Sequence, residues 1–200
     1  DLAENLRSKI GSTDSQIAII PNFVDIQKIS PADRQTSYRF ELGLNNQIVV
    51  MYAGNLGHSQ PLNLMVQAAR HHRDRKDVAY VINGGGVVAS ELIEQAQSLP
   101  NLFVTGFQPV ARLSEVLASA DVHVVLLKKG LGRSSLPSKL YSIFAAGRPV
   151  IASIDPETEV SKIISENRAG ITVEPEEFKE FIEAIEKLID NPGEREEMGA

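Results

Sequence analysis

The chain has 200 residues, of which 42% are hydrophobic, and a formal net charge of −6. This composition supports a packed domain core, and the acidic balance argues against nucleic acid as a partner. The absence of cysteine excludes disulfides and thiolate metal sites, and no apolar run reaches the roughly 20 residues that a transmembrane helix requires.

Strand-length apolar runs alternate along the chain with segments of helical periodicity. A first apolar run at 17–20 ends at Pro21, and the polar segment 30–37 is expected to form a loop. Later runs are predicted to be strands, at 48–53, 78–82, 102–105, 122–127, 150–153 and 171–173. Helices are predicted between and after them, at 61–69, 88–99, 113–118, 136–146, 157–167 and 178–189.

Apolar strands that alternate with helices are typical of a parallel sheet with both faces covered. The predicted fold class is α/β: a Rossmann-like, doubly wound, mostly parallel six-stranded sheet with helices on both faces. Ligands of such sheets bind beyond the carboxyl ends of the strands. The loops that begin at Gly54, Asn83, Gly106 and Lys128 are therefore expected to form the site, and glycines gather in them.

The first of these loops contains Gly54, Asn55, Leu56, Gly57 and His58, between a predicted strand and a predicted helix. Backbone N–H groups at such a turn can hold phosphate oxygens. An ordinary strand-to-helix turn would have the same sequence character, so both interpretations remain open.

The second glycine run, G-G-G at 84–86, also follows a predicted strand. It does not match the G-x-G-x-x-G fingerprint of dinucleotide-binding proteins. Thr105 and Gly106, rather than an acidic residue, end the next strand. Both observations argue against an NAD-dependent enzyme.

The third candidate lies in a segment without Asp or Glu, residues 122–154, in an otherwise acidic chain. Within it, R-S-S-L-P-S-K at 133–139 opens a predicted helix and combines hydroxyls with two cations. Such a combination suits a diphosphate. The alternative is a capped helix on the surface.

The four histidines show no spacing typical of a metal site, so no metal is expected. His71 and His72 stand between Arg70 and Arg73 and are expected to be solvated. His123 lies within a predicted strand and is expected to be structural, whereas His58 is a candidate for the site. No nucleophile elbow or Walker loop is present.

An ordered set of motifs resembles the group 1 retaining glycosyltransferases of the GT-B architecture, over about residues 15–200. The motifs are I-P-N-F-V-D at 20–25, Y-A-G-N-L-G at 52–57, N-G-G-G at 83–86, V-T-G-F at 104–107, A-D-V at 120–122 and A-A-G-R-P-V-I-A at 145–152. The G-N-L-G and L-P-S-K variants resemble a subgroup that builds capsule, O-antigen or colanic-acid-type polysaccharides.

The resemblance implies the C-terminal half of a GT-B fold, with residues 1–15 after the hinge and 16–200 as the donor-binding domain. An N-terminal acceptor domain would be missing, since both ends of the sequence are expected to lie inside a longer chain. The full protein would be a cytoplasmic, hexosyl-type transferase whose contact with the inner membrane lies in that missing half. This half alone is expected to be inactive.

The implied donor is a nucleotide-diphosphate sugar, most simply a UDP- or GDP-sugar, and the acceptor is a glycan or a lipid-linked glycan. No further cofactor is expected, and no catalytic residue is assigned. A nucleotide-sugar epimerase of the same architecture and a non-catalytic partner subunit that binds nucleotide sugars remain the alternatives.

Two departures from the family pattern affect the expected site. Asn55 and Gln60 stand where the family often carries Arg and Lys, and Ser134 and Ser142 stand where it carries two Glu residues. Lys139 and Arg133 are hypothesised to replace the lost cations. The residues predicted to bind the donor are Gly54, Asn55, Leu56, Gly57, His58, Gly84, Gly85, Gly106, Phe107, Arg133, Ser134, Ser135, Pro137, Ser138, Lys139 and Ser142.

Overall fold

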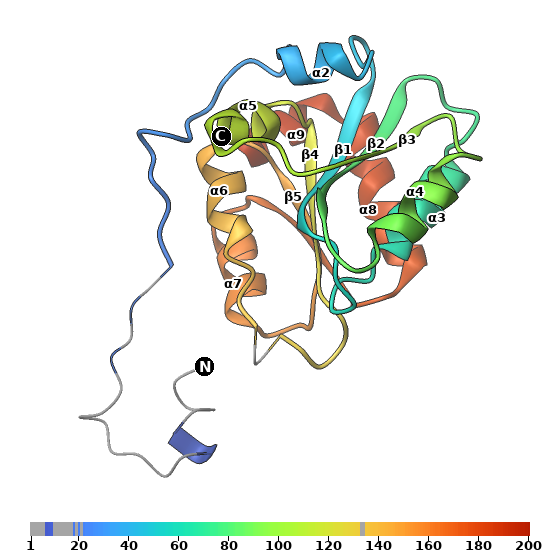
Figure 1. The fold of residues 1–200 in the computed structure, drawn as a ribbon. Helices are drawn as coiled ribbons and strands as arrows, with labels where there is room; N and C mark the ends of the chain where they lie inside the picture. The colour runs from blue at the N-terminus through green and yellow to red at the C-terminus, as the bar shows by residue number, and fades with distance from the viewer. Residues whose placement is uncertain (1–6, 10–17, 19, 21, 133–134) are drawn as a thin grey trace.

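The computed structural model describes residues 7–9, 18, 20, 22–132 and 135–200. Its centre is a parallel sheet with the strand order β3-β2-β1-β4-β5-β6 (Figure 1). The strands are β1 (Ile48–Asn55), β2 (Val78–Gly85), β3 (Leu102–Thr105), β4 (Val122–Leu126), β5 (Val150–Ser153) and β6 (Gly170–Val173). This order reverses between β1 and β4, which is the arrangement of a doubly wound sheet.

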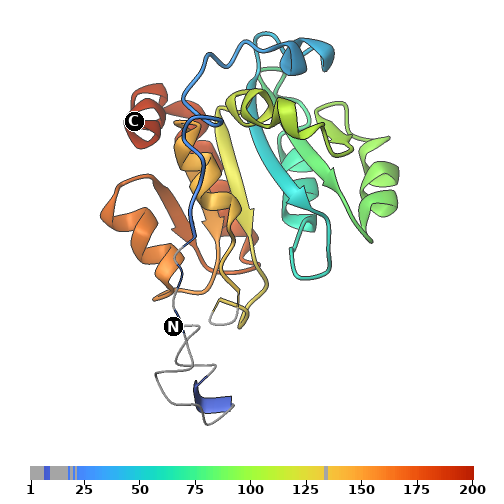
Figure 2. The same ribbon diagram turned by 60° about the vertical axis from the view of Figure 1, so that its left-hand side comes forward.

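Helices cover both faces of the sheet (Figure 2). One face packs against α3 (Asn63–His71), α4 (Ala89–Ala96) and α8 (Phe178–Asp190) in the largest hydrophobic cluster. The other face packs against α2 (Ser37–Glu41), α5 (Leu113–Ala118), α6 (Lys139–Ala145) and α7 (Glu159–Glu166). None of the helices in the described part of the chain is long and apolar enough to cross a bilayer.

The predicted fold class is confirmed, and all the strands predicted from 48 onward are present. The central strands β1, β2, β4 and β5 could be predicted because they are mostly buried and are therefore largely apolar along their length. Helix α6 begins at Lys139 rather than at 136, and α4 ends at Ala96 rather than at 99. The apolar run at 17–20 and the boundary at residue 15 lie largely or wholly outside the described residues.

Within residues 22–132 and 135–200, three short elements were not predicted: α2, the 3-10 helix η2 (Val110–Arg112) and α9 (Pro192–Gly199). Helix α2 follows the expected polar loop and is capped by Thr36, whose hydroxyl accepts a hydrogen bond from the N–H of Arg39. Helix α9 begins with Pro192 and has few apolar residues, so it lacks the periodicity on which the predictions relied.

Asp121, at the entrance to β4, holds three segments together. Its buried carboxylate accepts hydrogen bonds from Arg39 at 3.0 Å, from Arg34 at 2.8 Å and from the backbone N–H of Val49 at 2.8 Å. Arg39 also donates to the carbonyl of Leu44 at 2.6 Å. The ion pair between Asp121 and Arg39 therefore fixes α2 and the starts of β1 and β4. These contacts lie at the edge of the sheet opposite the carboxyl ends of the strands.

Replacing Asp121 with alanine is expected to lower the free energy of unfolding by about 3–5 kcal/mol, because Arg39 would stay buried without its counter-charge. Arg34 is half-exposed, so Arg34→Ala, which breaks only the outer contact, should cost about 1 kcal/mol or less. Urea denaturation of the three proteins measures both changes. Equal losses in the two variants would show that the buried pair is not the anchor.

Candidate functional site

The carboxyl ends of β1 and β2 approach each other unusually closely. Gly54 pairs with Gly84 and Asn55 with Gly85 in the parallel register. Gly84 has a φ of +156°, and a Cβ atom at this position would lie 1.8 Å from the carbonyl oxygen of Gly54. Any larger residue at position 84 would force the two strand ends apart, so the glycine run fixes this edge, which we call the rim.

Lys139 brings a positive charge to the rim from the first turn of α6. Its Nζ atom lies 3.7 Å from the centre of the Tyr52 ring, within the range of a cation–π contact. A Cβ atom on Gly54 would lie 2.7 Å from the same Nζ atom, so the lysine occupies space that a side chain at position 54 would fill. Burial lowers the pKa of the Lys139 amine to about 7.

The location of this amine follows from the topology. Strand β1 pairs with β4 only at Val50↔Val122 and Met51↔His123, before its carboxyl end. Lys139 therefore lies where β1 and β4 have stopped pairing, which is the switch point of the sheet. Tyr52 also fixes the backbone at the end of β1, because the Tyr52 hydroxyl donates a 2.7 Å hydrogen bond to the carbonyl of Asn55.

The loop after β3 places an aromatic ring beside the glycines. Phe107 is 66% exposed, and its ring would lie 3.0 Å from a Cβ atom on Gly85. Asn83 holds this loop against β2, since its side-chain amide donates to the carbonyl of Gly106 and to the hydroxyl of Thr105, both at 2.9 Å. Sequence analysis assigned no role to this amide.

The loop after β4 is fixed by an acid that sequence analysis also missed. The carboxylate of Asp155 accepts hydrogen bonds from the N–H groups of Gly130 and Gly132, both at 2.9 Å. Asp155 stands two residues beyond β5, at the carboxyl edge of the sheet, and this position could have identified it. The N–H of Lys128 donates to the carbonyl of Ser59 at 3.0 Å, which ties the loop to the one after β1.

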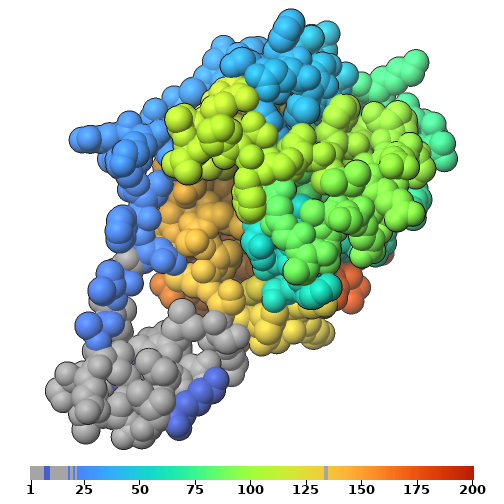
Figure 3. Space-filling model, in the orientation of Figure 1, coloured from blue at the N-terminus to red at the C-terminus, as the bar shows by residue number. Residues whose placement is uncertain are grey.

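Most of the predicted site residues lie along this rim. In the space-filling view, the segments after β1 and β4 lie side by side in the lower half of the molecule (Figure 3). The rim residues from the predicted set are Gly54, Asn55, Gly57, His58, Gly84, Gly85, Gly106, Phe107 and Lys139. Arg133 and Ser134, which were also predicted to bind the donor, lie outside the described residues.

The remaining residues that were predicted to bind the donor differ in burial and in position relative to α6. Leu56 is buried in the core, and its backbone is bonded to Gly85 and Val88, so its observed role is packing. Ser142 lies one turn after Lys139 on α6, on the same side of the helix. Ser135, Pro137 and Ser138 precede that helix, and Ser138 makes no side-chain capping bond to it.

A cavity of about 240 Å³ opens beside the rim, between the loop after β1, helix α4 and the loops after β4 and β6. His58, Gln60, Lys128 and Glu176 are among the residues that line it. The side-chain oxygen of Gln60 accepts a 3.2 Å hydrogen bond from the N–H of Gly57, which steadies the first glycine loop.

Two expectations about the histidines have different outcomes. His123 is buried as expected, with its Nε2 atom 2.9 Å from the carbonyl of Leu117, and burial lowers its pKa to about 4. The expectation that His72 is solvated was wrong. Its side chain is buried against Tyr80, whose hydroxyl lies 2.7 Å from His72 Nδ1.

Comparison with known proteins places this geometry in a family. Residues 34–200 match the sequence profile of the family described as Glycosyl transferases group 1. The chain belongs to this family. WcaI of Escherichia coli strain K12, which is named as a colanic acid biosynthesis glycosyl transferase, is 30% identical over 186 residues. That match covers 90% of this chain and 45% of WcaI, so the chain spans just under half of its relative.

Solved structures of GT-B glycosyltransferases share the fold. Anabaena Alr3699/HepE in complex with UDP-glucose superposes with a TM-score of 0.80 at 16% identity, covering 98% of this chain and 54% of that one. The C-terminal domain of LpcC, a group 1 family protein from Francisella tularensis, has a TM-score of 0.70 at 19% identity. In that case 88% of this chain covers 93% of the other, so the two domains correspond almost end to end.

The lowered pKa of Lys139 makes a prediction about stability. Because the folded pKa of about 7 lies below the unfolded value of 10.5, the unfolded chain binds more protons between these two pH values. The free energy of unfolding of the wild type should therefore rise with pH through this window, relative to Lys139→Met. Urea denaturation at several pH values, with the exposed Lys162→Met as control, measures the difference. Parallel profiles for wild type and Lys139→Met would contradict it.

Proposed function

We propose that this chain is the donor-binding domain of a glycosyltransferase that takes a sugar from a nucleotide-diphosphate sugar. The acceptor in this proposal is a glycan or lipid-linked glycan of polysaccharide biosynthesis, and the transfer retains the anomeric configuration. Membership of the group 1 family supports transfer, and the name of WcaI supports the polysaccharide context. The acceptor would bind to a part of the protein that this chain does not contain.

The observation that carries the proposal is the amine of Lys139 beside Gly54. A diphosphate needs positive charge and close backbone approach, and the rim supplies both within one small region. The amine is half neutral near pH 7 in the free protein. A bound diphosphate would favour the charged form, so binding above pH 7 would draw a proton from solution.

The loop after β3 supports a place for the nucleobase. The exposed ring of Phe107 beside Gly85 offers a flat apolar surface at the same rim. Stacking of a base on an aromatic side chain is tolerant of the base, so it suits UDP and GDP alike. The UDP-glucose complex of the HepE structure supports a UDP-sugar as the first ligand to test.

Transfer would require the domain to stabilise the departing diphosphate. Cleavage of the bond to the sugar leaves additional negative charge on the phosphate oxygens, and a preorganised cation lowers the energy of that state. Lys139 is held by the Tyr52 ring before any ligand arrives, so it needs little rearrangement. In this proposal Lys139, rather than a metal ion, supplies the charge that faces the diphosphate.

The two alternatives, an epimerase and a non-catalytic subunit, receive less support. WcaI is named as a transferase, and so is a similar protein from Streptomyces kanamyceticus, an α-D-kanosaminyltransferase. The acids at this edge, Asp155 and Glu176, accept hydrogen bonds from backbone N–H groups, whereas an epimerase would need acids or bases that face the sugar. We therefore keep transfer as the proposed reaction.

Lys139→Ala is expected to weaken binding of UDP and GDP about tenfold or more, since a hydrogen bond to a charged group contributes about 1.5–3 kcal/mol. Lys162→Ala, which removes an exposed cation from α7, is the charge-matched control and should bind as the wild type does. Isothermal titration calorimetry at pH 6.5 measures all three affinities. Unchanged affinity in Lys139→Ala would remove the basis of the proposal.

A further inference from the structure

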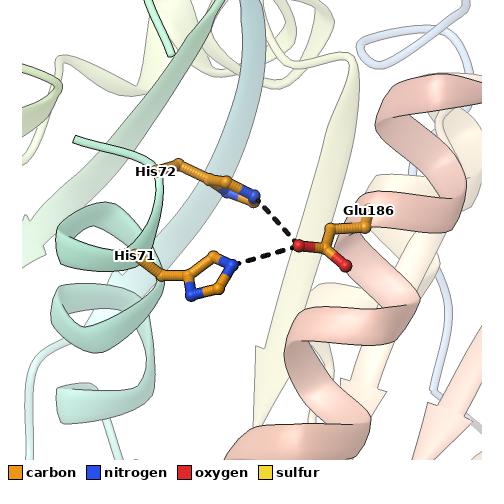
Figure 4. Close-up of side chains that lie close together, drawn as sticks. All are labelled: His71, His72 and Glu186. Carbon is orange, nitrogen blue, oxygen red and sulfur yellow. Dashed lines mark hydrogen bonds and ion pairs between the residues drawn. The ribbon is translucent and has the colours of Figure 1, made fainter. Parts of the chain in front are cut away.

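A second cluster of polar side chains lies far from the rim, where the end of α3 meets the middle of α8. The rings of His71 and His72 both point toward one carboxylate oxygen of Glu186 (Figure 4). The Nε2 atoms lie 3.1 and 3.5 Å from that oxygen. Among the described residues, these are the only three metal-type side chains whose ligand atoms all lie within 4.8 Å of one another.

The separations fit a tetrahedral metal ion. Zinc binds histidine nitrogen and carboxylate oxygen at about 2.0–2.2 Å, which places neighbouring ligand atoms about 3.3–3.5 Å apart. The two observed N···O distances, 3.1 and 3.5 Å, lie at or close to this range. The ligand atoms of all three residues lie within 4.8 Å of one another, so adjustment of the partly exposed His71 and Glu186 side chains would complete the coordination.

The least mobile of the three ligands is already oriented for this role. His72 is buried, and its Nδ1 atom lies 2.7 Å from the hydroxyl of Tyr80, whose ring stacks on the imidazole. A tyrosine hydroxyl can accept as well as donate, so it can stabilise the tautomer that carries the proton on Nδ1. That tautomer leaves the lone pair of Nε2 free for a metal, and such outer partners typically orient metal-bound histidines.

We propose that His71, His72 and Glu186 form a binding site for a divalent transition metal of zinc-like chemistry, with water in the fourth position. Two imidazoles and one carboxylate favour Zn²⁺ over Mg²⁺ or Ca²⁺, which prefer oxygen ligands. The ion can reach the site from solvent, since the side chains of His71 and Glu186 are 47% and 40% exposed.

The charges around His71, His72 and Glu186 permit a divalent cation to bind there. The positive charge of Arg75 acts on His72, and Arg75 is paired with Asp77 at 2.7 Å and with Asp190 at 3.1 Å. Its charge is therefore balanced locally. A bound ion would connect α3 to α8, the two helices that cover one face of the sheet, and would stabilise the folded state. This proposal does not depend on the proposed function.

Titration of the untagged 200-residue chain with ZnCl₂ by isothermal calorimetry tests the site. The wild type should bind one equivalent of Zn²⁺, and saturation should raise the midpoint of thermal unfolding, because an ion that binds only the folded state stabilises it. Mg²⁺ at the same concentration should do neither. Loss of a ligand should weaken Zn²⁺ binding about tenfold or more in both His71→Ala and Glu186→Gln.

His71→Ala and Glu186→Gln are expected to fold, so a loss of Zn²⁺ affinity in them reports on the site itself. Both side chains are partly exposed, and circular dichroism checks that each variant is folded. His58→Ala removes the exposed histidine of the first glycine loop, and its Zn²⁺ affinity should equal that of the wild type. The proposal is overturned if the wild type shows no saturable binding, or if folded His71→Ala and Glu186→Gln keep the wild-type affinity.

Discussion

The position of one amine sets the charge at the carboxyl edge of this sheet. Lys139 rests on the Tyr52 ring at the point where β1 and β4 have stopped pairing, and it fills the space that any side chain at Gly54 would occupy. The close approach of Gly84 to Gly54 fixes the neighbouring backbone. Cation, backbone and the exposed Phe107 ring are thus brought together by the strand order and by glycines.

The family pattern and this chain place positive charge differently. Asn55 and Gln60 stand where the family resemblance leads us to expect cations, and in the structure the side chain of Gln60 accepts a hydrogen bond from the N–H of Gly57. Under the proposed function, the charge that faces the diphosphate comes instead from α6, through Lys139. Ser142 follows one turn later on the same side of that helix and would be a neutral partner in this proposal. The two substitutions at 55 and 60 therefore do not leave the rim without a cation.

The strands and the rim could be predicted because their signals are local. Buried parallel strands are apolar throughout, and the glycines stand directly after them. Features that depend on contacts between distant residues could not be predicted in this way. Helix α2 is fixed by Arg39 and Asp121, 82 residues apart, and Asp155 acts on glycines 23 and 25 residues before it. The cluster of His71 with Glu186 spans 115 residues, so no local spacing could indicate it.

The most direct test of the central claim is a map of where a sugar nucleotide binds. UDP-glucose titrated into ¹⁵N-labelled protein should shift the amide signals of the rim, at 54–58, 84–86, 106–108 and 138–142, and those signals should respond little in Lys139→Ala. The account would be contradicted if saturating UDP-glucose shifted amides at the opposite edge of the sheet, around Asp121, and left those of the rim unchanged.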